Sequence, residues 1–190
     1  MLYIIRHGQT DWNALKKLQG RTNIPLNEKG REMARHARDE YKDVHFDVCY
    51  CSPLDRARET ADILLSGRDV PIIIDERLIE MSFGVYEGKP YSFENADCEM
   101  NTFFCTPEKY THPVEGGESI DELFARTGEF LKNVVEPQLA DGKDVLIVGH
   151  GAMNSSIVCR IKGLPVKDFW SAGIENCKLM QLTINESLRS

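Results

Sequence analysis

Two histidines in this chain each follow a short apolar run and precede a glycine. His7 follows the run at residues 2–5, and His150 follows the run at residues 145–148. Each run has the length and the Ile, Val and Leu content of a strand that is buried on both faces of a sheet. Because ligands of open parallel sheets bind at the carboxyl ends of the strands, both histidines are expected at one edge of the sheet. Arg6, directly before His7, makes an anion the expected substrate.

These residue types are consistent with phosphoryl transfer. It depends on positioning and on neutralising the charge of the phosphoryl oxygens, which the planar guanidinium groups of Arg6 and Arg56 can do. Arg56 lies near the start of a predicted helix, where free backbone N–H groups also favour phosphate. A neutral imidazole is a good nucleophile near pH 7. One ring N–H of His7 must then donate a hydrogen bond to a carbonyl, so that the other ring nitrogen is unprotonated.

Four segments carry a more specific pattern. They are residues 6–13 (RHGQTDWN), 52–61 (SPLDRARETA), 78–88 (LIEMSFGVYEG) and 148–151 (VGHG). In this order they resemble the histidine phosphatase superfamily, the group that includes the cofactor-dependent phosphoglycerate mutases. The resemblance spans about residues 1–160 and implies a phosphoglycerate mutase-like fold.

The resemblance also implies catalytic roles for five residues. His7 would become phosphorylated during turnover, and Arg6, Arg56 and His150 would surround the phosphoryl group. Glu80 matches the acidic position of the family and is the expected general acid. A dianionic phosphate nearby favours the protonated carboxyl, which can protonate the alkoxide leaving group. The same carboxylate would then take a proton from the water that attacks the phosphohistidine.

A second set of residues is expected to bind the substrate. The set consists of Thr10, Asn13, Gln19, Gly20, Arg21 and Gly151. By the resemblance, Asn13 would donate a hydrogen bond to the phosphoryl group, and the loop at residues 19–21 would face the substrate. Thr10 is expected to support this region through its hydroxyl more than to touch the substrate.

Each of these assignments has a structural alternative. A histidine at a strand end, taken alone, is more often structural than catalytic, but the matching positions of His7 and His150 favour catalysis. Arg56 could be a surface charge of its helix, and Glu80 could form a salt bridge with an arginine. Glu87, which precedes Gly88 in the third segment, is interpreted as structural.

No metal and no cofactor are expected. The two arginines of the pocket would repel a divalent cation, and no H-x-H or H-E-x-x-H spacing occurs. His36, His45 and His112 have no supporting pattern and are expected on the surface. The six cysteines show no C-x-x-C spacing and are expected to be free thiols. Cys49 and Cys51, which share a predicted strand, are expected on opposite sides of it.

The composition suits a globular protein of one domain. The 190 residues are 42% hydrophobic and 28% charged, which is enough for a full hydrophobic core. The net charge of −7 argues against a nucleic-acid partner or an anionic membrane surface. Arg6 interrupts the first apolar run too early for a signal peptide, and no stretch approaches the ~20 apolar residues of a membrane helix. The protein is therefore expected in the cytoplasm.

The sequence alternates predicted strands with predicted helices, which favours an α/β three-layer sandwich: a mostly parallel central sheet with helices on both faces. Strands are predicted at 2–6, 46–51, 70–74, 145–148 and 178–184, and helices after Asn27, after Pro53, after the capping-box pattern at 119–122 and at 153–161. Residues 1–190 are expected to form one domain. Residues 89–118 are too long for a plain connection and are expected to be a cap or specificity insertion.

The expected activity is that of a phosphomonoesterase of the histidine acid phosphatase type, acting on a small phosphorylated metabolite. Residues 89–118 are acidic and aromatic, which suits a partly apolar substrate better than a bisphosphoglycerate. One alternative is a cofactor-dependent phosphoglycerate mutase, for which Lys16, Lys17 and Arg21 could supply the missing positive charge. Another is a phospholigand-binding module without catalysis. A symmetric homodimer is expected only because such dimers are common among soluble proteins.

Overall fold

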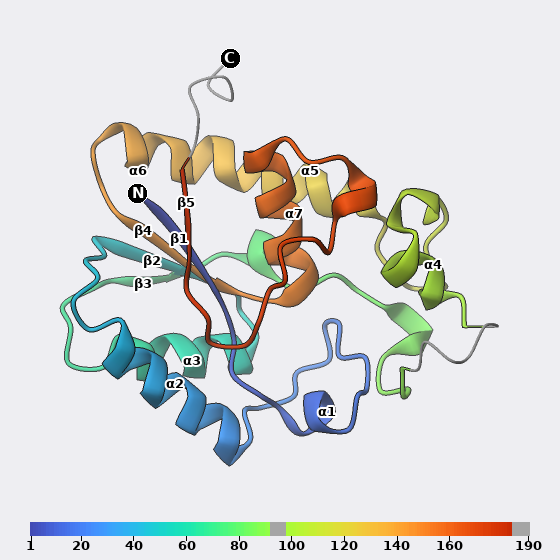
Figure 1. Ribbon diagram of the computed structural model, residues 1–190, viewed down its shortest axis with the longest axis horizontal. Helices are drawn as coiled ribbons and strands as arrows, with labels where there is room; N and C mark the ends of the chain where they lie inside the picture. The colour runs from blue at the N-terminus through green and yellow to red at the C-terminus, as the bar shows by residue number, and fades with distance from the viewer. Residues whose placement is uncertain (92–97, 184–190) are drawn as a thin grey trace.

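A five-stranded sheet forms the centre of the computed structural model, which describes residues 1–91 and 98–183 (Figure 1). The strand order is β3-β2-β4-β1-β5. The strands are β1 (Leu2–Arg6), β2 (Val48–Cys51), β3 (Ile72–Ile74), β4 (Val145–Gly149) and β5 (Met180–Leu182). The first four are mutually parallel, and β5 runs antiparallel to β1. The mostly parallel α/β fold is therefore confirmed.

Helices cover both faces of this sheet (Figure 1). Helices α2 (Glu28–Glu40) and α3 (Asp55–Leu64) pack on one face, and α5 (Ile120–Phe130) and α7 (Gly151–Lys162) pack on the other. Side chains of a strand alternate between the two faces. Accordingly, Leu146 and Val148 of β4 belong to the core under α2 and α3, whereas Val145 and Ile147 belong to the core under α5 and α7.

Shorter elements connect these layers. They are α1 (Asp11–Ala14), α4 (Met100–Cys105), α6 (Glu136–Ala140), a π-helical turn (Leu131–Val135) and 3₁₀ turns at Glu76–Leu78, Gly84–Tyr86, Pro107–Lys109 and Val166–Asp168. The π-helical turn joins α5 to α6, so the predicted amphipathic helix continues past its regular part. Within residues 1–91 and 98–183, no helix is long and apolar enough to cross a membrane.

Two of the predicted helix starts, those of α2 and α5, are confirmed by their caps. The Asn27 side chain accepts a hydrogen bond from the Gly30 N–H at 2.9 Å, which begins α2. At α5, the Ser119 hydroxyl accepts from the Glu122 N–H at 3.1 Å, and the Glu122 carboxylate accepts from the Ser119 N–H at 2.8 Å. This reciprocal pair satisfies two backbone donors that a helix start leaves open.

Three predicted strands are shorter in the structure, and one side-chain prediction is wrong. Strands β2, β3 and β5 begin two residues after the predicted starts, and residue 184 lies outside the described residues. Pro71 lacks a backbone donor, and only its carbonyl joins the sheet edge, as acceptor from Cys49. Cys49 and Cys51 face the same side, in the core with Ala57, because residues two apart on a strand share a face.

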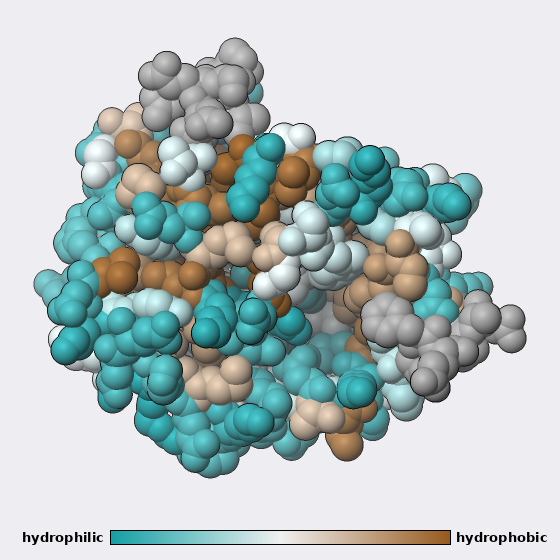
Figure 2. Space-filling view, in the orientation of Figure 1, coloured by the Kyte–Doolittle hydropathy of each residue, from teal (hydrophilic) through white to brown (hydrophobic). Residues whose placement is uncertain are grey.

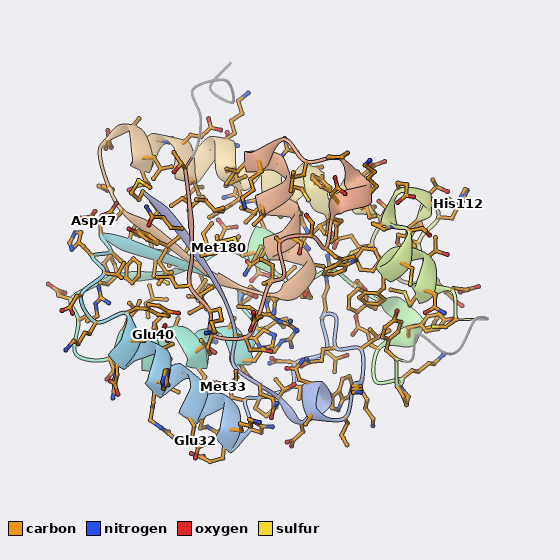
Figure 3. The ribbon with its side chains drawn as sticks, in the orientation of Figure 1. Glu32, Met33, Glu40, Asp47, His112 and Met180 are labelled. Atoms are coloured by element: carbon orange, nitrogen blue, oxygen red, sulfur yellow. The ribbon has the colours of Figure 1, made fainter. Side chains whose placement is uncertain are left out.

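Residues 98–118 lie beside the active edge of the sheet and carry α4 (Figure 1). Phe103 of α4 is fully buried and stacks edge-on against Trp170, whose indole N–H donates to the Phe103 carbonyl at 3.0 Å. This bond ties α4 to the segment that follows α7. Figure 3 shows His112 at the outer side of this part of the chain, away from the sheet, as predicted for a surface histidine.

Candidate active site

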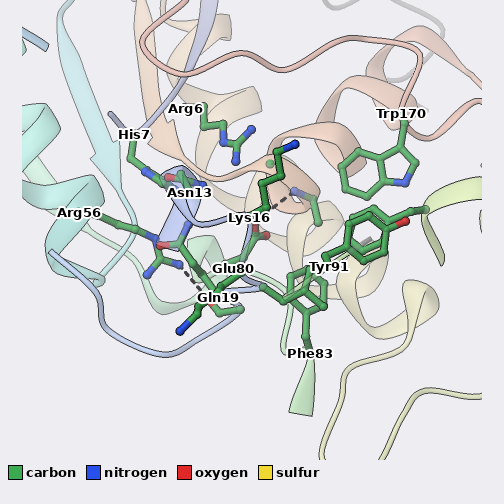
Figure 4. A pocket seen from close by; sticks show the side chains of 16 residues that line it. Arg6, His7, Asn13, Lys16, Gln19, Arg56, Glu80, Phe83, Tyr91 and Trp170 are labelled. Atoms are coloured by element: carbon green, nitrogen blue, oxygen red, sulfur yellow. Dashed lines mark hydrogen bonds between the residues drawn. The ribbon is translucent and has the colours of Figure 1, made fainter. Parts of the chain in front are cut away.

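The ends of β1 and β4 bring the two histidines together. Their parallel register pairs Arg6 with Gly149, so His7 and His150 leave the sheet from adjacent strand ends. The two rings lie 5.1 Å apart between centroids, at 60° to each other. A pocket of about 680 Å³ opens at this edge. Its lining includes Arg6, His7, Asn13, Gln19, Gly20, Arg56, Glu80 and Gly151, as the sequence predicted (Figure 4).

His7 is held with one bare ring nitrogen. Its Nδ1 lies 2.6 Å from the carbonyl of Gly8, an acceptor, so Nδ1 carries the proton and donates it there. The backbone is fixed as well, since the His7 N–H donates to Gly149 and Asn176 Nδ2 donates to the His7 carbonyl at 2.6 Å. Nε2 is therefore the unprotonated atom of a ring that lines the pocket.

Burial and neighbouring guanidinium groups keep this imidazole neutral. Burial, followed by the positive charges of Arg56 and Arg6, lowers the pKa of His7 well below its ordinary value of 6.5. The hydrogen bond to Gly8 opposes this shift without outweighing it. A neutral imidazole with a lone pair on Nε2 is the form that attacks an electrophile.

His150 lies behind His7 and does not line the pocket. Its Nε2 is 2.7 Å from the Ser52 hydroxyl, while Nδ1 has no hydrogen-bond partner in the part of the chain that the structure describes. Burial first, and then the charge of Arg56, lowers the pKa of His150 well below 6.5. The ring therefore offers a neutral, buried group with one unmet hydrogen bond next to His7.

Arg56 is a fully buried cation at the first turn of α3. Its Nη1 donates to the Thr22 carbonyl at 2.8 Å, and its Nη2 donates to the Gly20 carbonyl at 2.7 Å. Burial lowers the pKa of Arg56 to about 10, which Glu80 opposes, so the group stays charged near pH 7. Two backbone carbonyls thus aim a guanidinium group, through its remaining donors, at the pocket.

Arg6 completes the positive end of the pocket. Its Nη1 donates to the Ile174 carbonyl at 3.2 Å, and among the described residues its buried Nε has no partner. Burial lowers the pKa of Arg6, and the charge of Glu80 opposes that shift. A buried donor without a partner costs free energy unless a ligand satisfies it. Arg6 and Arg56 therefore make this end of the pocket suited to a phosphoryl group.

Glu80 lies across the pocket from these cations and is fixed by backbone donors (Figure 4). Its Oε1 accepts from the N–H groups of Met81 at 2.8 Å and Met153 at 3.0 Å. Its Oε2 accepts only from Ala152, at 3.2 Å, in the described structure. Oε2 therefore has a lone pair that no second backbone donor occupies. The N-terminus of α7 thus holds a carboxyl group, and no arginine forms a salt bridge with it within the described residues.

Glu87 has a structural role, as predicted, and fixes the loop that Arg56 contacts. Its carboxylate accepts from the N–H groups of Arg21 at 3.0 Å, Thr22 at 2.9 Å and Phe83 at 3.1 Å, and from the Thr22 hydroxyl at 2.5 Å. Gly20 precedes this loop with φ +52°, and a Cβ there would lie 2.0 Å from Glu87 Oε1. Only glycine fits this close approach.

Two of the predicted substrate-binding residues do not line the pocket. Arg21 bonds the Glu80 carbonyl at 3.1 Å through Nε and pairs with Glu118 at 3.1 Å through Nη2. Thr10 is buried; its side chain accepts from the Asn13 N–H and donates to Gln19 Oε1 at 2.8 Å. Both residues therefore support the pocket wall, which agrees with the prediction for Thr10 and differs from that for Arg21.

The outer half of the pocket was largely missed from sequence. It is lined by Lys16, Lys17, Leu18, Phe83, Tyr91, Phe104, Ala152 and Trp170. The aromatic content of residues 89–118 points to Phe104, and Lys16 and Lys17 are possible positive charges on sequence grounds. Trp170 gave no signal, because it follows α7 in an irregular segment and reaches the pocket only through its packing on α4.

The donor set of the site suits an anion better than a cation. Across residues 1–91 and 98–183, no three His, Cys, Asp or Glu side chains gather as a metal site would require. The pocket combines a neutral nucleophile, two guanidinium groups and one carboxyl group that can carry a proton. That combination can accept a phosphoryl group and protonate the oxygen that leaves.

Comparison with known proteins agrees with this geometry. The profile of the histidine phosphatase superfamily, branch 1, matches residues 2–189. The adenosylcobalamin/alpha-ribazole phosphatase of Salmonella typhimurium is 31% identical over 92% of this chain and 85% of its own length. The 2,3-bisphosphoglycerate-dependent phosphoglycerate mutase of Cytophaga hutchinsonii is 30% identical over 88% of this chain and 80% of its own.

Solved structures agree as well. Bacillus stearothermophilus YhfR superimposes with a TM-score of 0.80 at 34% identity, covering 90% of this chain and 83% of its own. The match covers nine-tenths of this chain, so the phosphoglycerate mutase-like fold is shared.

Proposed function

Because this chain belongs to the histidine phosphatase superfamily, whose members are phosphatases or mutases, we propose that it is a phosphomonoesterase that acts through a phosphohistidine. The observation that carries the proposal is the tautomer of His7. Its Nδ1–H donates to the Gly8 carbonyl, which leaves Nε2 bare in a pocket with two buried guanidinium groups. The substrate is a small phosphorylated metabolite.

In the first step, Nε2 of His7 attacks the phosphorus atom of the ester. The P–N bond forms as the bond from phosphorus to the alcohol oxygen breaks. Arg6 and Arg56 neutralise the charge on the phosphoryl oxygens, and Asn13 donates a hydrogen bond from the pocket wall. Oε2 of Glu80, protonated beside the bound dianion, gives its proton to the leaving oxygen, so that a neutral alcohol departs.

In the second step, water attacks the phosphohistidine. Glu80, now a carboxylate, takes a proton from this water as the P–N bond breaks. Inorganic phosphate forms, and the electron pair of the bond returns to Nε2 of His7. His150 packs edge-on against the His7 ring and helps to hold it in place. The chemistry uses only side chains and water.

A mutase would return the phosphoryl group to an alcohol instead of to water. One observation supports this second candidate: Lys16 and Lys17 line the outer pocket, where the second anion of a bisphosphate would bind. The aromatic side chains opposite favour the phosphatase, and residues 89–118, to which Phe104 belongs, fit a specificity segment. A binding module without catalysis would have no need of a fixed Nε2 and an acid together.

Rapid-quench labelling tests the proposal. Mixing the protein with a ³²P-labelled phosphomonoester should give acid-labile, alkali-stable phosphate on His7 within one turnover, followed by release of inorganic phosphate. The variant His7→Ala should show no label, while His36→Ala, changed at an exposed histidine, should label normally. Label that passes to an alcohol acceptor faster than to water would support the mutase. Turnover without label on His7 would overturn both candidates.

A further inference from the structure

The outer pocket has an aromatic wall built from three distant parts of the chain, in which the rings of Tyr91 and Phe83 are tilted by 46° and 56° against that of Phe104. Phe104 of α4 stacks on Trp170 with centroids 5.4 Å apart and planes 24° apart. Tyr91 contacts Phe104 at 4.4 Å, and Phe83 lies 6.1 Å from it. In Figure 2, apolar residues, in brown, border a hollow on the side of α4, and hydrophilic residues, in teal, border it on the side of α1. These aromatic side chains line the outer pocket, where the leaving group of a bound phosphomonoester would lie.

This wall is held rigidly. The Trp170 indole N–H donates to the Phe103 carbonyl at 3.0 Å, which fixes the plane of the indole. The Tyr91 N–H donates to the Lys16 carbonyl at 2.8 Å, and Leu18 exchanges backbone hydrogen bonds with the segment 88–89. The two sides of the mouth are therefore linked through the backbone. A preformed flat surface binds a flat group at a lower cost in side-chain entropy than a flexible one.

Lys16 faces this wall across the pocket. Figure 4 shows its side chain rising between Arg6 and Trp170. Its backbone has φ +52° just after α1, a conformation that Gly or Asn adopts with less strain. Backbone strain of this kind clusters at ligand-binding and active sites. An ammonium group on one side and aromatic faces on the other form a slot for an electron-rich ring, which both surfaces attract.

We infer that the phosphomonoester bound here is that of an alcohol carrying a flat aromatic or heteroaromatic ring, which lies between Lys16 and the wall of Tyr91, Phe104 and Trp170. The inference rests on the proposed function and names its substrate class. A pocket of 680 Å³ is far larger than a phosphoryl group needs and lies within the range of about 300–1,000 Å³ that holds a ligand with one or two rings.

The test compares leaving groups that differ in flatness but not in basicity. Benzyl, 2-phenylethyl and 3-phenylpropyl phosphates are each paired with the cyclohexyl analogue of the same spacer, alongside glycerol 3-phosphate and phosphoserine. All of these are alkyl esters, so the chemical step makes similar demands. We expect kcat/KM for the best ring substrate to exceed that of its saturated partner by about tenfold, as ring stacking and a cation–π contact together would give.

Two variants connect this preference to the slot. Phe104→Leu keeps an apolar side chain but removes a ring, and it should reduce the ring-to-cyclohexyl ratio to near 1. Phe124→Leu, a half-buried phenylalanine of α5 outside the pocket, is the matched control and should keep the ratio. Lys16→Asn relieves the backbone strain, so it should melt no lower than the parent protein while its ring-to-cyclohexyl ratio falls.

The outcomes separate this inference from the proposed function. Equal kcat/KM for ring and cyclohexyl esters, or faster turnover of glycerol 3-phosphate and phosphoserine than of every ring ester, would overturn the substrate class and leave the phosphatase standing. No phosphate release from any ester would overturn the phosphatase. In that case, calorimetry compares the affinities of 2-phenylethylphosphonate and 2-cyclohexylethylphosphonate. Tighter binding of the phenyl compound would support the slot for a ring, and equal binding would overturn it.

Discussion

Glu87 and Arg56 both hold the loop at residues 20–22 by hydrogen bonds to its backbone. The Glu87 carboxylate accepts from the backbone of Arg21 and Thr22, whereas the Arg56 guanidinium donates to the carbonyls of Gly20 and Thr22. The loop at residues 20–22 therefore couples the position of the Glu87 side chain to that of Arg56. The geometry of the cation that faces the phosphoryl group depends on a carboxylate outside the pocket lining.

Glu87→Ala should therefore lower activity through Arg56. Loss of four hydrogen bonds frees the loop, and a shift of about 1 Å in a positioning group can cost about 100-fold in rate. We expect kcat/KM to fall by roughly 10- to 100-fold. Glu87→Gln, which keeps an acceptor, should lose less. Glu108→Ala, at an exposed glutamate, is the control, and an unchanged rate in Glu87→Ala would refute the coupling.

Glu80→Gln should slow the turnover of an ester more when the leaving group of that ester is more basic. An alkoxide needs the proton of Glu80, whereas 4-nitrophenolate leaves without one. General acid catalysis contributes about 10²- to 10⁴-fold, so alkyl phosphate turnover should fall by that factor while 4-nitrophenyl phosphate loses much less in the phosphorylation step. Single-turnover rates with both esters measure this. Equal losses for the two would exclude Glu80 as the general acid.

The acid limb of the rate profile should lie below pH 6.5. Burial and the charges of Arg56 and Arg6 lower the pKa of His7 well below 6.5. Nε2 therefore stays unprotonated when the pH of the solution is lowered to 6.5. A profile of kcat/KM, corrected for the second ionisation of the phosphate ester, should show no loss from protonation of the nucleophile at pH 6.5. A nucleophile that titrates at or above 6.5 would contradict the buried, cation-flanked environment.

Stability should depend on pH through the same two histidines. Their pKa values are lowered in the folded state, so below 6.5 the unfolded chain binds more protons than the folded chain. This contribution to stability is complete above 6.5 and is lost as the pH falls toward the folded-state values. His7→Asn removes one of the two groups and should make the decline shallower by up to about 1.4 kcal/mol per pH unit.

Urea unfolding between pH 7 and pH 5 measures that difference. The exposed His112→Asn is the control and should follow the parent protein closely. Parallel stability curves for His7→Asn and the parent would show that His7 has the same pKa in both states.

Vanadate should inhibit competitively, and a chelator should leave the rate unchanged. Vanadate adopts the trigonal bipyramid of the phosphoryl centre and would be held by Arg6 and Arg56 while bonded to Nε2 of His7. Since the positive charge of the site comes from guanidinium groups, incubation with EDTA followed by gel filtration should preserve full activity. Loss of activity that added divalent metal restores would refute this account of charge neutralisation.

Much of the catalytic end could be predicted from the sequence. Two Ile- and Val-rich runs that lead into His-Gly predict that both histidines lie at one edge of the sheet, and the parallel register of Arg6 with Gly149 confirms this. Asn27 and the Ser119–Glu122 pair mark helix starts because caps are local, with donor and acceptor within three residues. The residue types at 6, 7, 56 and 80 are also consistent with phosphoryl transfer without any knowledge of their geometry.

The outer pocket could not be predicted in the same way. Trp170 and Phe104 are 66 positions apart and lie in segments without regular periodicity, yet they stack in the fold. The prediction that Arg21 would face the substrate differed from the structure, because Glu80 and Glu118 both hold its side chain. Such contacts depend on how the connections pack, which a local pattern does not record.

The sequence alone determined which groups this protein has for chemistry and at which strand and helix ends they would lie, because side-chain type and hydrophobic period act over a few residues. The tertiary structure alone decided that Nδ1 of His7 meets a carbonyl, that the start of α7 holds Glu80, and that Lys16 faces an aromatic wall. These arrangements arise from packing between segments far apart in the chain, where ångström-scale distances select which atoms can bond.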